Sequence, residues 1–181
     1  MARIKWFLMA LFLFLGQAAL AADDIEDDAS LTAMEKKQLK QVQDSLALVT
    51  KDSNQTKEEK QGVLSDALKN VLVQNSQPSD MSIDALAGNL ANNIGIGSIG
   101  VQDSMKLTKK LMKFLNKGDF STDSNRGLVK DVEGIVQTSG LSQDDRNKLY
   151  NAVLTVVSTA DGNAPNSPRP HFVQLLLSNR G

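Results

Sequence analysis

Residues 105–117 read MKLTKKLMKFLNK, and this stretch decides how the chain is expected to fold. At about 100° per residue on a helix, the lysines fall within an arc of about 100° and the bulky apolar residues fill the arc opposite. The pattern predicts an amphipathic helix over about 103–116 that stops at Gly118, a residue type common at helix ends. The candidate contact residues on it are Lys106, Lys109, Lys110, Lys113, Lys117 and Phe114.

This helix has two interpretations. A cationic face beside a Leu/Met/Phe face is typical of helices that lie in a lipid interface or bind an acidic partner. The same pattern also fits an ordinary bundle helix whose lysines only face solvent. The two differ in whether the apolar face is permanently buried. A run of acidic residues at 23–28 offers the lysines a partner within the same chain.

Outward from this helix, the chain shows five more helical patterns and almost no strand pattern. Thr32 with Glu35, and Thr56 with Glu59, are capping boxes that open two of them. The others are expected near 83–94, from about 128 to Gly140, and from Ser142 to about 161. A shift of 86 residues lays the apolar pattern of 41–73 over that of 127–159. We therefore predict an all-α bundle of about six amphipathic helices, with two similar helical hairpins flanking a middle pair.

The N-terminus has the three parts of a secretory signal peptide. Arg3 and Lys5 precede the apolar run WFLMALFLFL, and Ala19 and Ala21 form an A-x-A cleavage site. The apolar run is about half as long as a membrane-spanning helix needs to be. We expect residues 1–21 to be removed and the protein to be exported to a periplasmic or extracellular location. An exported chain without cysteine fits the bacterial envelope.

The rest of the chain divides into four parts. Residues 22–30 carry five carboxylates and are expected to form a disordered acidic arm. Residues 31–162 form the helical domain. Residues 163–170 hold three of the four prolines and predict an extended tether. The apolar segment 171–181 either folds back over the bundle or is exposed for docking.

The motifs that could indicate a cofactor site, a metal site or a catalytic site are all incomplete. Residues 95–100 match G-x-G-x-x-G, but a helix precedes them where a dinucleotide site needs a strand. Residues 119–125 alternate oxygen-bearing side chains like a calcium loop, but lack its sixth-position Gly and twelfth-position Glu, so helix capping explains them better. The single histidine, His171, has no triad context. We therefore expect no enzyme activity, cofactor or metal, and a net charge of −1 gives no field for nucleic acid.

One family resemblance exists. Leu31-Thr32-x-x-Glu35 and Leu141-Ser142-x-x-Asp145-Arg146 resemble the L-T-x-x-Q pattern of small helical periplasmic stress chaperones, although the Gln is absent from both. The likeness covers about a dozen residues, and L-[ST]-x-x-[ED] is also a general helix start. It implies an exported, helical chaperone.

Taken together, these patterns predict an exported, non-enzymatic helical binding or accessory protein of the bacterial envelope. Its contact surface would be the lysine-rich helix face, and its partner a protein or an anionic surface. The first alternative is a membrane-surface protein that inserts the helix 103–117, and the second is a small periplasmic chaperone.

Overall fold

The computed structural model describes Ile25 and residues 28–51, 54–73 and 76–162, and this part of the chain contains helices and no strand. The predicted signal peptide, most of the acidic arm, the tether and the C-terminal segment lie outside the described residues. The helices are α2 (Ala33–Lys51), α3 (Lys57–Leu72), α4 (Asp80–Gly95), α5 (Val101–Lys117), α6 (Thr122–Thr138) and α7 (Gln143–Gly162). The predicted all-α bundle of six helices is confirmed.

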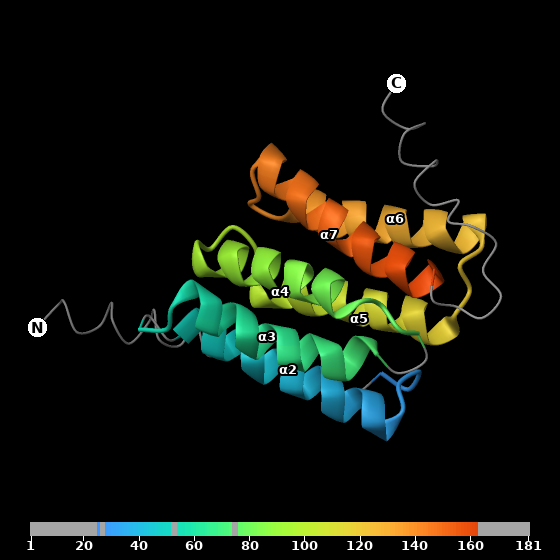
Figure 1. The fold of residues 1–181 in the computed structure, drawn as a ribbon, viewed down its shortest axis with the longest axis horizontal. Coiled ribbons are helices and arrows are strands. Elements are labelled where there is room, and N and C mark those ends of the chain that lie inside the picture. The colour runs from blue at the N-terminus through green and yellow to red at the C-terminus, as the bar shows by residue number, and fades with distance from the viewer. Residues whose placement is uncertain (1–24, 26–27, 52–53, 74–75, 163–181) are drawn as a thin grey trace, which may run out of the picture.

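The helices form two layers of three (Figure 1). In one layer α4 lies between α3 and α7, and in the other α5 lies between α2 and α6. The pairs α2–α3 and α6–α7 therefore flank the middle pair α4 and α5 (Figure 1). Because α5 is central in its layer, it is bordered on one side by α6, which follows it directly in the chain, and on the other by α2, which is distant in the sequence.

Local signals in the sequence set the helix ends. Thr56 Oγ1 accepts the Glu59 N–H at 3.2 Å, and the Glu59 carboxylate accepts the Thr56 N–H at 2.7 Å, which completes the expected capping box. Gly118 ends α5 in the left-handed conformation with φ of 62°, as its residue type predicts. Helix α6 begins at Thr122, earlier than its first apolar residue Leu128 suggested, because Ser121 caps it.

One continuous core lies between the two layers. It consists mostly of Leu, Val, Ile and Ala, and the apolar residues of all six helices contribute to it. The G-x-G-x-x-G stretch forms the connection between α4 and α5, and Gly97 adopts a φ of 72° there. No helix within the described residues is both long and apolar enough to cross a membrane.

Candidate functional site

The apolar side of α5 is part of the core. Leu107, Leu111, Met112 and Leu115 are each at most 1% exposed. Phe114 is partly buried and its ring meets that of Phe120 edge-to-face, with centroids 5.6 Å apart. In the folded protein this side of the helix is therefore covered by its neighbours, and the outer side carries the lysine face, which we define as Lys106, Lys109, Lys110, Lys113 and Lys117.

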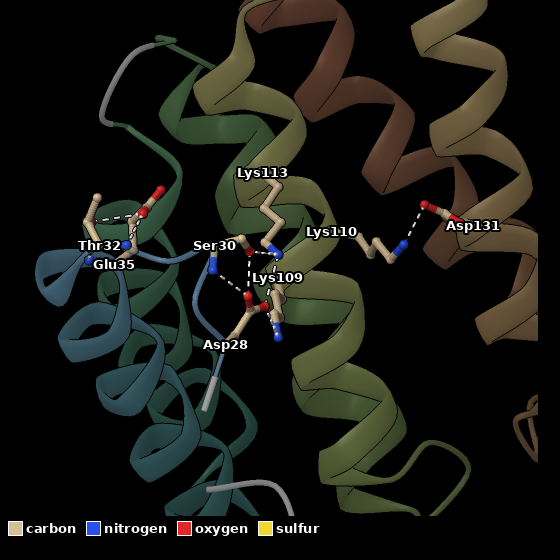
Figure 2. Close-up of polar contacts among 8 residues, drawn as sticks. All are labelled: Asp28, Ser30, Thr32, Glu35, Lys109, Lys110, Lys113 and Asp131. Carbon is tan, nitrogen blue, oxygen red and sulfur yellow. Dashed lines mark hydrogen bonds and ion pairs between the residues drawn. The ribbon is translucent and has the colours of Figure 1, made fainter. Parts of the chain in front are cut away.

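Each lysine of the lysine face lies near a carboxylate of the same chain. Lys106 pairs with Asp103 one turn earlier at 3.6 Å, and Lys117 pairs with Asp119 beyond the helix end at 3.3 Å. Lys110 reaches across to Asp131 of α6 at 2.8 Å (Figure 2). Lys109 and Lys113 share a single partner, Asp28, which comes from the acidic arm.

Asp28 sits between the two ammonium groups of Lys109 and Lys113 (Figure 2). Its Oδ2 lies 2.7 Å from Lys109 Nζ and 3.0 Å from Lys113 Nζ. Its Oδ1 accepts the Ser30 N–H at 2.9 Å and the Ser30 hydroxyl. Lys113 also donates to Ser30 Oγ at 2.8 Å. We call this group of Asp28, Ser30, Lys109 and Lys113 the arm clasp.

Within the arm clasp, the Asp28–Lys109 pair is less exposed than the other ion pairs on α5. The side chains of Asp28 and Lys109 are 20% and 24% exposed, against 59% for Lys106 and 67% for Lys117. The Lys109 ammonium, followed by the Ser30 hydroxyl and Lys113, holds the pKa of Asp28 well below its usual value of 3.8. The hydrogen bonds of Asp28 with the two lysines join charged groups, and the lower exposure of Asp28 and Lys109 reduces screening of their contact by water.

The end of the acidic arm differs from the expectation of a solvated, disordered segment. Ile25 and Leu31 on either side of the arm clasp are buried, at 5% and 7% exposure. Their burial, together with the contacts of Asp28, holds residues 28–30 against α5. The expected pairing of the arm with the lysines is confirmed at Asp28. Residues 23, 24, 26 and 27 lie outside the described residues.

A further contact ties the start of α2 to the end of α5. Asn116 Nδ2 donates to Glu35 Oε1 at 2.8 Å, while the other Glu35 oxygen accepts the Thr32 N–H at 2.8 Å. The Thr32 N–H is the largest cause of a lowered pKa at Glu35. The sequence pattern identified Glu35 only as a helix cap, and Asp131, Ser30 and Asn116 were not identified, because their partners are distant in the chain.

A polar groove of about 330 Å³ lies over α4, between α3 and α7, and two of the residues that line it are carboxylates, Asp84 and Asp145. Asp84 accepts the Ser65 hydroxyl and pairs with Lys69 at 3.0 Å, and these two contacts lower its pKa. Asp145 caps α7 by bonding to Ser142. Both carboxylates therefore have structural partners in the folded chain.

Three of the calcium-like residues, Asp119, Ser121 and Asn125, form hydrogen bonds around the start of α6. Asp119 accepts the Ser121 N–H at 3.1 Å and the Ser124 hydroxyl, and Asn125 Nδ2 donates to the Phe120 carbonyl at 2.9 Å. The Ser124 hydroxyl is the main cause of a lowered pKa at Asp119. The predicted capping role is confirmed at Ser121, whose Oγ accepts the Ser124 N–H at 3.4 Å at the start of α6. Among the described residues no three His, Cys, Asp or Glu side chains are grouped as metal ligands would be.

No protein-family model matches the chain, and no curated protein and no solved structure matches it.

The arm clasp is expected to weaken only in acid. Because the folded-state pKa of Asp28 lies below its unfolded value of 3.8, Asp28 contributes stability above that pH and loses its contribution as the pH falls toward the folded-state pKa. The difference in unfolding free energy between wild type and Asp28→Asn should be constant from about pH 5 to 8 and shrink below about pH 4. Urea denaturation of both proteins at each pH measures it, and a difference that peaks below pH 4 would contradict the assignment.

Proposed function

We propose that the protein is an exported, non-enzymatic binding protein of the bacterial envelope that takes an acidic segment of a partner protein on Lys109 and Lys113. The observation that carries the proposal is the arm clasp. One carboxylate of the chain is held there by two lysines and a serine. A surface that holds an acidic segment from its own chain has the chemistry to hold one from another protein.

The position of the clasp makes exchange feasible. Asp103, Asp119 and Asp131 belong to α5, α6 or the turn between them, so they stay beside their lysines whenever the bundle is folded. Asp28 precedes α2, and it is the carboxylate partner that can leave without disturbing a helix. An acidic partner would therefore compete at Lys109 and Lys113 rather than along the whole lysine face.

The membrane-surface alternative requires a change in the fold. Insertion of α5 into lipid needs its apolar side, which includes the fully covered Leu111 and Met112, to leave the core. Contact of the lysines alone with anionic lipid would be screened at about 1 M salt, whereas an inserted helix would stay bound. Vesicle co-sedimentation at low and high salt separates these two cases.

The proposal predicts a site-specific loss of binding. We expect a fluorescent hexaglutamate peptide to bind the full chain, and the double variant Lys109→Gln/Lys113→Gln to lose about tenfold in affinity. Fluorescence anisotropy at low salt measures it. The matched control Lys106→Gln/Lys117→Gln removes the same charge from more exposed lysines and should keep most of the affinity. An equal loss in both double variants would show a diffuse charge effect and contradict the proposed site.

A further inference from the structure

The docked arm carries a definite sequence pattern. Ile25 and Leu31 are buried, and Asp28 lies three residues from each of them. Ser30 adds a hydroxyl that touches both Asp28 and Lys113. In the sequence, these four residues stand in the order aliphatic-x-x-Asp-x-Ser-aliphatic.

A turn at residues 28–31 orients the Asp28 carboxylate toward Lys109 and Lys113. The Leu31 N–H donates to the Asp28 carbonyl at 3.1 Å, and the Ser30 N–H donates to Asp28 Oδ1 at 2.9 Å. This is the side-chain turn that Asp forms with the backbone two residues on. Oδ1 is thereby used inside the arm, and Oδ2 is the oxygen that faces the two ammonium groups (Figure 2).

This geometry depends on the residue type. Glu carries the same charge as Asp, but its extra methylene group moves the carboxylate away from the N–H two residues on. A Glu at position 28 could reach a lysine, but it would not keep one oxygen on Ser30 and the other on Lys109 and Lys113. Ser30 contributes because its hydroxyl donates to Asp28 and accepts from Lys113. The contacts distinguish Asp-x-Ser from a general acidic run.

The two aliphatic residues supply the rest of the recognition. Ile25 and Leu31 both belong to the continuous core, at 5% and 7% exposure. Burial of an aliphatic side chain favours docking whatever the salt concentration, whereas the contacts of Asp28 are screened by salt. A ligand that has charged groups but no aliphatic side chains would not fill the buried positions that Ile25 and Leu31 occupy.

We propose that the site recognises the pattern aliphatic-x-x-Asp-x-Ser-aliphatic in an acidic segment of a separate partner protein, and that Ile25, Asp28, Ser30 and Leu31 are an internal copy of the recognised residues of that ligand. The inference rests on the proposed function and specifies which acidic segments the site binds. A peptide segment fits better than an anionic lipid surface, because one oxygen of the Asp28 carboxylate is held by the backbone N–H of Ser30, and a lipid has no such backbone.

The test uses the full chain with the arm clasp weakened by Asp28→Asn. A labelled peptide of residues 22–32 (ADDIEDDASLT) is titrated by fluorescence anisotropy, beside hexaglutamate and a scrambled peptide of the same composition. We expect the pattern peptide to bind about tenfold more tightly than either control. Peptides that carry Asp28→Glu or Ser30→Ala should each lose most of this advantage, and binding should weaken when Leu31 is replaced by Ser.

The outcomes separate the two proposals. If the Asp28→Glu or the scrambled peptide binds as well as the pattern peptide, charge alone is recognised, so the pattern is overturned while the proposed function stands. If neither hexaglutamate nor the pattern peptide binds, the proposed function fails. Light scattering tests a second copy of the chain as the occupant, and a dimer of the wild-type protein that Asp28→Asn dissociates would overturn the assignment to a separate protein.

Discussion

Replacement of Leu111 by Ala is expected to lower the free energy of unfolding by about 2–5 kcal/mol. Leu111 is 0% exposed on the inner side of α5, and α5 packs against helices of both layers. Removal of its side chain leaves a cavity that the surrounding helices fill only in part. Urea denaturation followed by circular dichroism measures the change.

An exposed residue supplies the control for this prediction. Met81 is 81% exposed at the start of α4, so Met81→Ala should change the unfolding free energy by less than about 0.5 kcal/mol. A similarly small effect for Leu111→Ala would mean that the apolar side of α5 is not held in the core in solution. The membrane-surface alternative would then become the better account of this helix.

The second large effect concerns binding, and it follows from the internal competition at the lysines. Asp28→Asn keeps the size of the side chain and removes the charge that Lys109 and Lys113 share. If the arm occupies these lysines about nine-tenths of the time, opening it raises the apparent affinity for hexaglutamate about tenfold. Anisotropy titrations of wild type and variant under the same salt conditions measure the gain.

Two controls make this result specific. Asp44→Asn causes the same change of net charge at an exposed position on α2 and should leave the affinity near that of wild type. In the Lys109→Gln/Lys113→Gln background, Asp28→Asn should produce no gain, because the groups that Asp28 covers are already gone. A full gain in that background would place the competition somewhere other than the arm clasp.

The features predicted from sequence are those set by neighbours in the chain. Capping boxes such as Thr56 with Glu59, the cap at Gly118 and the apolar side of α5 involve residues within one or two turns of each other. Such local signals were enough to predict six helices. They contain no information on which helices share a layer, so the order α3–α4–α7 and α2–α5–α6 came only from the structure.

In the candidate site, too, contacts between neighbours in the chain could be predicted and most contacts between distant residues could not. The lysines of α5 could be found by helical periodicity, and the pairing with the acidic arm could be proposed from charge. The partner of Lys110 could not, because Asp131 lies on a different helix. Asp28 was identified only as one of five acidic residues in the arm. The feature that distinguishes Asp28 is apolar, since Ile25 and Leu31, three residues before and after it, are both buried.

The contact between Asp28 and Lys113 has a consequence for the order of folding. It joins residues that are 85 positions apart, so it closes a loop that includes α2, α3 and α4. Loop-closure entropy makes such a contact unfavourable until α2 has packed on α5, because that packing closes nearly the same loop and brings residues 28–30 close to Lys113. Residues 28–30 are therefore expected to dock last during folding and to be among the first to detach in local unfolding, while the six helices keep their native packing.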